Sequence, residues 1–378
     1  MKKVLIITIS CLFAFGYAQD GGGSAELPRD FVFGDDRPFK ECHASTLVAL
    51  DDGNFLVAWF GGTKEKDPDV AIWISKGKAG NWSAPRKVMK IRQDAHWNPV
   101  LFKDAKGTIH LYFKVGKEIP SWETWVTRST DGGLNWSEAV ELVEGDKGGR
   151  GPVRNKPIPL SDGSWLAGAS HEEGLWDVFV DRSEDEGKTW QATSYLAIDR
   201  NGFKGKGVIQ PTLWESAPGK VHMLCRSTEG KIYRSDSEDY GKTWRPLYAT
   251  DMPNNNSGID LVKLPDGTLV MAYNPVSGNW ASRASLNLAV SYDNGLTWPK
   301  QFILENDSAK AEYSYPAIIT YGDRIALTYT WKRQRIAFRE LPVERVSSGQ
   351  SSKSNVRIPV IYSTGLYHPV LKGLLETL

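Results

Sequence analysis

Short stretches of alternating apolar and polar residues, each broken by a glycine-containing turn, run along most of the chain. One stretch runs from Phe55 to Trp59 after the turn at Asp52-Gly53, and another runs from Val70 to Ile74. Such alternation is typical of β-strands with one buried face. The same strand–turn–strand pattern recurs around Gly107, Asp162-Gly163, Gly219, Asp266-Gly267 and Gly322-Asp323. The pattern therefore predicts an all-β fold of many short strands.

A tryptophan repeat sets the period of this pattern. Trp82, Trp136, Trp190, Trp244 and Trp298 follow one another at intervals of 54 residues. The last four each close an octapeptide of the form Ser-x-Asp-x-Gly-x-Thr/Asn-Trp, and Ser75–Trp82 is a degenerate fifth copy. Asp and Gly favour a tight turn, the hydroxyls bond its backbone and the tryptophan covers it, so we expect these residues to be structural. Several strands in each fixed repeat predict a β-propeller.

Six repeating units can be counted, and they form one domain. The units start near His43, Asn98, Lys156, Gln210, Ile259 and Tyr315. The sixth unit, Tyr315–Leu341, lacks the octapeptide, so we expect a strand from outside it to close the ring, either Phe31–Phe33 or Val356–Tyr362. We assign residues 19–40 to an N-terminal extension, 41–345 to the propeller and 346–378 to a C-terminal closing segment. A short helix could form over Leu371–Leu378.

The composition is that of an ordinary globular protein. The 378 residues are 40% hydrophobic and 24% charged, which excludes disorder, collagen and coiled coil. The 46 basic and 45 acidic residues give a net charge of +1 without long runs of either sign, which argues against a nucleic-acid surface or a polybasic membrane surface. Cys42 and Cys225 lie far apart; they could pair, although two buried free thiols are the expectation.

The first 18 residues have the pattern of a secretory signal peptide. Lys2 and Lys3 precede an apolar stretch, Val4–Phe15, and Gly16-Tyr17-Ala18 provides a small-x-small cleavage site. A buried N-terminal strand or a lipoprotein signal at Cys11 is the alternative. Because the rest of the chain lacks an apolar run of about 18 residues, we expect a secreted or periplasmic monomer without a membrane span.

The octapeptide, present once in each of four units, resembles the Asp-box of the sialidase (neuraminidase) superfamily, and the resemblance covers residues 40–345. It implies an all-β, six-bladed propeller in which the first strand of each blade lines a central funnel. The same box occurs in receptors and lectins, so it indicates the fold more than the chemistry.

The resemblance also implies site residues. Arg226 and Arg283 resemble two of the three arginines that bind the substrate carboxylate, a role suited to the forked guanidinium group. Tyr313, followed by serine, resembles the nucleophile, and Asp67 or Asp69 lies where these enzymes keep the general acid. Each has a plainer alternative: a solvated arginine, an aromatic ring that fills the channel, or a solvated loop.

Two positions depart from the family pattern. His43 stands where the first arginine is expected, and Gln210 stands where a glutamate would activate the tyrosine. An amide cannot take a proton, whereas His43, with Glu41 two residues earlier, could act as a base. Three further residues near the blade entrances, His96, Asn98 and Lys156, are candidates for substrate binding.

Three functions are compatible with these residues. The first is an exo-glycoside hydrolase that acts on an acidic sugar, either sialic-acid-like or uronate-containing. The alternatives are a lyase that cleaves a uronate polysaccharide by β-elimination, with an arginine, His43 and Tyr313, and a non-catalytic glycan-binding propeller. The cysteines lack C-x-x-C spacing and no Asp-x-Asp-x-Asp-Gly series occurs, so we expect neither a metal nor another cofactor.

Overall fold

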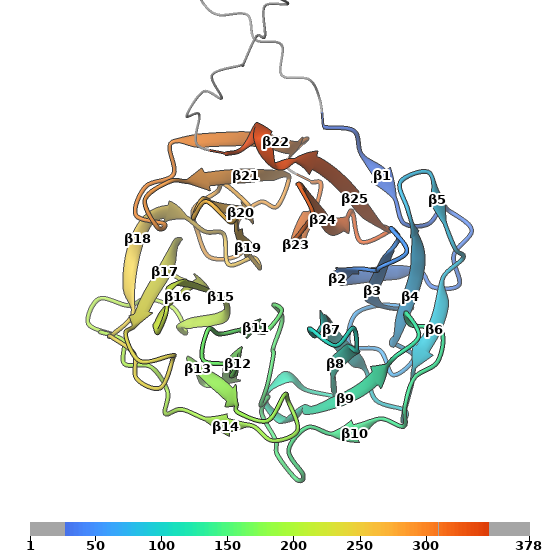
Figure 1. Ribbon diagram of the computed structural model, residues 1–378, viewed down its shortest axis with the longest axis horizontal. Helices are drawn as coiled ribbons and strands as arrows, with labels where there is room; N and C mark the ends of the chain where they lie inside the picture. The colour runs from blue at the N-terminus through green and yellow to red at the C-terminus, as the bar shows by residue number, and fades with distance from the viewer. Residues whose placement is uncertain (1–26, 309, 348–378) are drawn as a thin grey trace, which may run out of the picture.

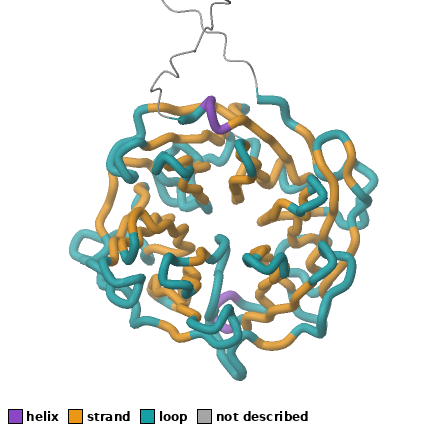
Figure 2. Tube along the Cα trace, viewed as in Figure 1, coloured by secondary structure: helices purple, strands orange, loops and turns teal. Residues whose placement is uncertain are grey.

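The computed structural model describes residues 27–308 and 310–347. Its strands form six sheets arranged around a central axis, and each sheet has one end strand nearest to that axis and the other on the outside (Figure 1). Strands and loops make up nearly all of the described chain (Figure 2). These observations confirm the predicted all-β, six-bladed propeller. The predicted leader 1–18, the alternative closing strand Val356–Tyr362 and the predicted helix Leu371–Leu378 lie outside the described residues.

The first three blades follow the chain order. Blade 1 contains β2 (Glu41–Ala49), β3 (Phe55–Gly62), β4 (Ala71–Lys78), β5 (Asn81–Trp82) and β6 (Arg86–Met89). Blade 2 contains β7 (His96–Lys103), β8 (Ile109–Val115), β9 (Glu123–Ser129) and β10 (Val140–Glu141), with the 3₁₀ helix η1 (Ile119–Ser121) before β9. Blade 3 contains β11 (Ile158–Pro159), β12 (Trp165–Glu173), β13 (Leu175–Ser183) and β14 (Gln191–Ala192).

The last three blades complete the ring. Blade 4 contains β15 (Val208–Ala217), β16 (Lys220–Ser227), β17 (Lys231–Ser237) and β18 (Tyr248–Pro253). Blade 5 contains β19 (Asp260–Lys263), β20 (Leu269–Tyr273), β21 (Ser285–Ser291) and β22 (Lys300–Asn306). Blade 6 contains β23 (Tyr313–Tyr321), β24 (Arg324–Trp331) and β25 (Arg335–Pro342), joined by β1 (Asp30–Phe31), and η2 (Val343–Arg345) follows β25.

The strand β1 closes the ring by completing the last blade. It pairs antiparallel with β25, with Phe31 opposite Ala337, and the Val32 N–H donates to the Ile336 carbonyl at 3.0 Å. The Phe31 ring also packs edge-on against Trp331, with centroids 5.2 Å apart. This confirms Phe31 as part of the closing strand. Both ends of the propeller are therefore held in a single sheet.

The Asp-box turns have the structural role that the sequence predicts. In the box of blade 2, Asp131 Oδ1 accepts the Asn135 N–H at 2.9 Å, and Ser129 Oγ accepts the Gly133 N–H at 2.9 Å. Trp136 Nε1 donates to the Gly133 carbonyl at 3.1 Å. The glycine has a φ of 85°, which disfavours any side chain there.

A bulge recurs near the start of the inner strand in blades 1, 2, 4 and 6. The pairing with the next strand shifts register there, and a non-glycine residue takes a positive φ. These residues are Ala44 (φ 55°), Asn98 (38°), Gln210 (56°) and Tyr315 (52°). Bulges re-aim side chains, and positive φ values at non-glycine residues persist where the surroundings impose them. Three of the four belong to or adjoin the site described below.

The two described cysteines, Cys42 and Cys225, are both buried free thiols, as the sequence predicts. Burial also raises the pKa of each thiol. Within the described residues, no helix is long and apolar enough to cross a membrane.

Candidate functional site

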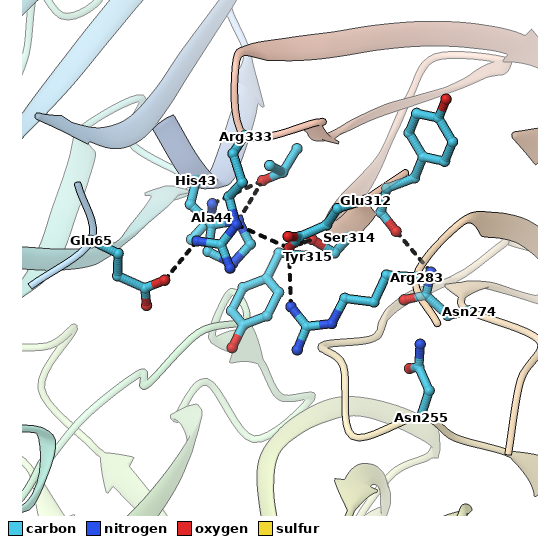
Figure 3. A network of polar contacts seen from close by, with 12 residues as sticks. His43, Ala44, Glu65, Asn255, Asn274, Arg283, Glu312, Ser314, Tyr315 and Arg333 are labelled. Carbon is cyan, nitrogen blue, oxygen red and sulfur yellow. Dashed lines mark hydrogen bonds and ion pairs between the residues drawn. The ribbon is translucent and has the colours of Figure 1, made fainter. Parts of the chain in front are cut away.

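Tyr315 forms the centre of a cluster of buried and partly buried arginines at the entrance of blade 6. The guanidinium carbons of Arg154, Arg226 and Arg283 lie 5.2, 5.6 and 5.7 Å from the centroid of its ring. Arg226 Nη1 donates to Tyr315 Oη at 2.7 Å. The imidazole of His43 packs against the same phenol ring, with centroids 4.1 Å apart. Figure 3 shows Tyr315 between His43 and Arg283.

Arg226 is held rigidly at the end of β16. It is only 2% exposed, and its Nη1 also donates to Gln210 Oε1 at 3.1 Å. Its Nε and Nη2 donate to Asn256 Oδ1 at 3.0 and 2.8 Å, and Nη2 also contacts the Asn256 carbonyl. Gln210 therefore orients Arg226 beside the tyrosine hydroxyl.

A second group of charges borders the first. Glu312 Oε1 accepts from Arg283 Nη1 at 3.1 Å, from Arg333 Nε at 3.0 Å and from Ser314 Oγ at 2.8 Å. Arg333 Nη1 also donates to Glu65 Oε2 at 2.6 Å (Figure 3). Burial acts to raise the pKa of Glu312, but Arg333 and Arg283 outweigh it and hold that pKa below its usual range. Glu312 is therefore ionised at neutral pH.

The arginines outnumber the carboxylates that bond them. Glu312 and Glu65 pair with Arg283 and Arg333, whereas the partners of Arg226 are amide, carbonyl and phenol oxygens. Arg154 Nη2 donates to the Tyr315 and Pro316 carbonyls at 2.5 and 2.9 Å. Burial lowers the pKa of Arg154 to about 10, so it remains charged at neutral pH.

Uncompensated buried charge is costly, so a site of this kind favours an anionic ligand. A carboxylate fits two neighbouring guanidinium groups well, because each of them can donate two parallel hydrogen bonds to it.

His43 contributes a neutral imidazole to this positive environment. It is 2% exposed, and its Nδ1 lies 2.8 Å from Thr330 Oγ1, which also accepts the Ala44 N–H at 3.2 Å. Burial lowers the pKa of His43 well below its usual value, and the four surrounding arginines lower it further. Its orienting partner is thus Thr330 of the neighbouring blade rather than Glu41.

Trp280 covers the arginines at the rim. The loop before β21 places its ring 5.8 Å from the guanidinium carbon of Arg226 and 5.6 Å from that of Arg283, and the residue is 65% exposed. Asn256 Nδ2 donates to Asn279 Oδ1 at 2.9 Å, which ties this loop to the residue that holds Arg226. An exposed indole beside a polar site is a suitable platform for one face of a sugar ring.

Glu172, near the end of β12, is an acidic residue that lies close to Arg226. The residue is partly exposed, yet its Oε1 is buried without a hydrogen-bond partner. Burial raises the pKa of Glu172 to about 7, although Arg226 and Lys206 oppose this shift. A carboxyl group with such a pKa can donate or accept a proton near neutral pH.

Tyr313 does not occupy the position that the resemblance implies. Its hydroxyl donates to Asp307 Oδ2 at 2.9 Å, and its ring packs in the apolar core between blades 5 and 6. In a regular strand Tyr313 and Tyr315 would share a face, but the bulge after Ser314 turns Tyr315 toward the arginines. The structure therefore places Tyr315, and not the predicted Tyr313, beside the arginines.

The loop between β3 and β4 contributes a different acid from those predicted. Asp69 Oδ2 accepts from both the backbone N–H and the hydroxyl of Thr63, each at 2.8 Å, so it stabilises the loop itself. Asp67 is half-buried in the same loop, where its backbone N–H donates to the Lys64 carbonyl. Glu65 is the acidic residue of this loop that bonds an arginine of the cluster.

Three candidates for substrate binding form hydrogen bonds or ion pairs within the chain. His96 accepts the Ile91 N–H through Nε2 at 2.9 Å, and burial lowers its pKa to about 4. Asn98 Nδ2 donates to the Val153 carbonyl at 3.1 Å. Lys156 Nζ bonds both carboxylate oxygens of Asp260, at 3.0 and 2.9 Å.

Asp260 accepts further bonds from blades 4 and 6. Thr212 Oγ1 donates to its Oδ1 at 2.8 Å, and the Ile318 N–H donates to its Oδ2 at 3.0 Å. The Lys156–Asp260 pair thus links the inner strands of the propeller rather than facing a substrate.

A sequence signal for Tyr315 exists in the repeat. Asn98, Gln210 and Tyr315 each precede a proline and each occupy the bulge, so the Tyr-Pro pair marks the entrance residue more reliably than the Tyr-Ser pair. Arg154, Arg333 and Trp280 carry no such periodic signal, because loops and strand ends bring them to the site.

Comparison with known proteins supports the family and the fold. The family model described as the BNR repeat-like domain matches residues 53–327. Among curated proteins, the photosystem II assembly lipoprotein Ycf48 of Prochlorococcus marinus is 28% identical over 175 residues. That match covers 46% of this chain and 42% of the relative, so it spans less than half of either protein.

Solved structures with this fold include named sialidases. A Hadza microbial sialidase has a TM-score of 0.68 at 17% identity, over 81% of this chain and 66% of that chain. A protein of unknown function from Dyadobacter fermentans has a TM-score of 0.68 at 17% identity, over 84% and 98%. A variant of the NanB sialidase of Streptococcus pneumoniae has a TM-score of 0.66 at 14% identity, over 85% and 71%. Identities this low show a common fold only.

Proposed function

The chain belongs to the BNR repeat-like domain family, and from this premise and the geometry of the site we propose that it is an enzyme that cleaves glycans at an acidic sugar. The observation that carries the proposal is the excess of buried positive charge around Tyr315. Arg226 and Arg154 bond no carboxylate, so an anionic group of the substrate supplies the missing charge.

The carboxylate of the sugar binds to Arg226 and Arg283. Both guanidinium groups lie beside the Tyr315 ring, and both donate to the Asn256 carbonyl. Trp280 then covers one face of the sugar ring. This arrangement holds the reacting carbon near Tyr315 Oη, and positioning of this kind accounts for much of enzymatic rate enhancement.

The reaction that we propose is retaining hydrolysis. Tyr315 Oη forms a bond to the anomeric carbon, its proton passes to neutral His43, and the bond from that carbon to the leaving oxygen breaks. The leaving oxygen takes the proton of Glu172, whose pKa of about 7 keeps a proton available. Water then attacks the anomeric carbon and the bond to Tyr315 Oη breaks. One proton of the water passes to Glu172, and His43 returns its proton to Tyr315 Oη. Asp67 and Asp69 stay predictions for the acid, and comparison of Glu172→Gln with Asp67→Asn and Asp69→Asn tests them.

One observation favours a lyase as the second candidate. The described partners of Tyr315 Oη and of His43 do not include a carboxylate, and His43 is neutral beside the phenol. With Nδ1–H donating to Thr330, His43 Nε2 can take the C5 proton of a uronate. The C4–oxygen bond then breaks, a double bond forms between C4 and C5, and Tyr315 protonates the leaving oxygen.

The product distinguishes these functions. Purified protein is incubated with a panel of sialosides and of uronate polysaccharides, while released acidic sugar and ultraviolet absorbance are followed together. Released sugar without absorbance is expected for the hydrolase, and rising absorbance from an unsaturated uronate would replace it by the lyase. Saturable binding without turnover of any substrate would contradict both and leave a glycan-binding propeller.

A further inference from the structure

A second cavity lies beside blade 3, on the opposite side of β12 from the arginine cluster. It has a volume of about 450 Å³, which is within the range of small-ligand pockets. The loop after β10 forms one wall, and the outer strands of blade 3 form the other. The residues used below are Asp146, Lys147, Arg150, His171, Phe179 and Tyr195.

The end of β12 separates this cavity from the candidate active site. His171 lines the cavity, whereas the next residue, Glu172, interacts electrostatically with Arg226. Successive side chains of a strand point to opposite faces, so the two sites share the end of β12 as a common wall.

The cavity has an aromatic wall. The centroid of the Tyr195 ring lies 5.7 Å from that of Phe179 and 6.1 Å from that of His171. The planes of the Tyr195 and His171 rings are inclined by 18° to each other. Tyr195 Oη pairs with His171 Nδ1 at 3.1 Å, and the residue is 54% exposed. An amphipathic ring held in one orientation provides apolar contact to a sugar face and a hydroxyl for its polar edge.

The two basic residues of the cavity lining, Lys147 and Arg150, are each paired with a carboxylate, in contrast to Arg226 and Arg154 beside Tyr315. Arg150 bonds Asp181 through Nε at 2.9 Å and Nη2 at 2.6 Å, and Lys147 pairs with Glu123. Asp146 Oδ2 accepts the backbone N–H of Arg150 at 3.3 Å. Because both basic residues of the lining already bond carboxylates, the cavity favours an uncharged ligand over a second acidic sugar.

We propose that this cavity binds a neutral sugar residue of the same glycan whose acidic sugar binds at Arg226. The inference rests on the proposed function, and it adds that the substrate is an oligosaccharide or polysaccharide with a neutral unit beyond the acidic one. Two subsites on one chain raise affinity without any change at the reacting bond.

The test uses the full chain and the variants Tyr195→Ala, Tyr195→Phe and Arg226→Lys, with Tyr248→Ala as a matched control. Tyr248 is another exposed tyrosine, on the outer strand β18. Binding of neutral trisaccharides of gluco, galacto, manno, xylo and rhamno configuration is measured by ligand-observed nuclear magnetic resonance and calorimetry. Thermal unfolding of every variant shows whether it is folded.

We expect Tyr195→Ala to weaken binding of a neutral trisaccharide at least about tenfold, whereas Arg226→Lys and Tyr248→Ala keep it. Tyr195→Phe, which keeps the ring, retains most of the binding. If the protein turns over the glycan, Tyr195→Ala raises the KM for the oligosaccharide. The KM for an aryl glycoside of the acidic sugar stays unchanged. Binding of neutral sugars through Tyr195 without turnover would support the cavity while the enzymatic function fails. Equal binding by wild type and Tyr195→Ala, or turnover without any effect at Tyr195, would overturn the inference.

Discussion

At the residue scale, the hydroxyl of Tyr315 and the imidazole of His43 are the two uncharged reactive groups within a shell of buried arginines. Arg226 bonds the hydroxyl at 2.7 Å, and the His43 ring packs against the phenol. Neither group adds negative charge before the reaction, so an anionic sugar meets no repulsion from them. Tyr313, two residues earlier, bonds Asp307 and lies in the core. The two tyrosines therefore form a natural pair for mutation.

We predict that Tyr315→Phe abolishes turnover, with kcat reduced at least about a thousandfold, because the nucleophilic or acidic hydroxyl is lost. Tyr313→Phe is the matched control and loses only the bond to Asp307, worth about 1 kcal/mol of unfolding free energy. Steady-state kinetics and urea denaturation on the two variants measure both quantities. If Tyr313→Phe were inactive and Tyr315→Phe active, the corrected assignment would be wrong.

A second prediction at this scale concerns Glu172 and pH. Its folded-state pKa is raised to about 7, above the ordinary value of 4.5, so wild-type stability falls as pH rises between these values. Glu172→Gln removes this loss. Its free energy of unfolding therefore exceeds that of wild type by an amount that grows across this pH range to at most about 3 kcal/mol.

Urea denaturation from pH 4.5 to pH 8 measures this gain, and the exposed neighbour Glu173→Gln serves as control. Parallel stability curves for Glu172→Gln and wild type would show that the carboxyl is not buried in this way. If Glu172 is the general acid, the activity of wild type declines above a pH of about 7, because the carboxyl group loses its proton there. The activity of Glu172→Gln would not show this decline.

At the element scale, the Asp-box turns and the bulges differ in how clearly the sequence encodes them. The turns are encoded locally, since each uses its own Ser, Asp and Gly, and a fixed interval of 54 residues makes them visible. The bulges also recur, at Asn98, Gln210 and Tyr315, but their mark is a single following proline. For this reason the sequence predicts the blades and their starts, whereas the tyrosine that it selects at the entrance of blade 6, Tyr313, lies in the core and not beside the arginines.

The box of blade 3 gives a prediction about stability alone. Asp185 accepts bonds from the Lys188 and Thr189 backbone N–H groups at 3.1 and 2.8 Å, and from the Ser183 and Thr189 hydroxyls. We expect Asp185→Ala to lower the unfolding free energy by about 1–2 kcal/mol without changing kcat, because the turn lies far along the sheet from the inner strand. Lys188→Ala, at an exposed box position, is the control. An unchanged midpoint in urea for Asp185→Ala would argue against the structural role.

At the scale of the whole molecule, the ring brings together side chains from five separate blades. His43 comes from blade 1, Glu172 from blade 3, Arg226 from blade 4, Arg283 from blade 5 and Tyr315 from blade 6. The repeat positions predict His43 and Gln210, and the resemblance to sialidases predicts Arg226 and Arg283. The structure places all four in or beside the cluster. The repeat and the resemblance do not predict which charges remain unpaired, because that depends on contacts between loops hundreds of residues apart, such as the Glu65–Arg333 pair.

Closure of the ring by β1 predicts cooperative unfolding. Phe31 packs on Trp331, and β1 pairs with β25, so the N-terminal segment holds the last blade in place. We expect Phe31→Ala to lower the unfolding free energy by about 1–3 kcal/mol while circular dichroism and tryptophan fluorescence still report one transition. Separate transitions for the two probes in wild type would contradict a single cooperative ring.

The central claim is that buried arginines recognise the carboxylate of the sugar being cleaved. The most direct measurement compares kcat/KM for an acidic glycan substrate with that for the same glycan after its carboxylate has been reduced to an alcohol. We predict a loss of at least about a hundredfold on reduction, because Arg226 is then left without an anionic partner and Arg283 keeps only Glu312. Equal kcat/KM values for the two glycans would contradict the account.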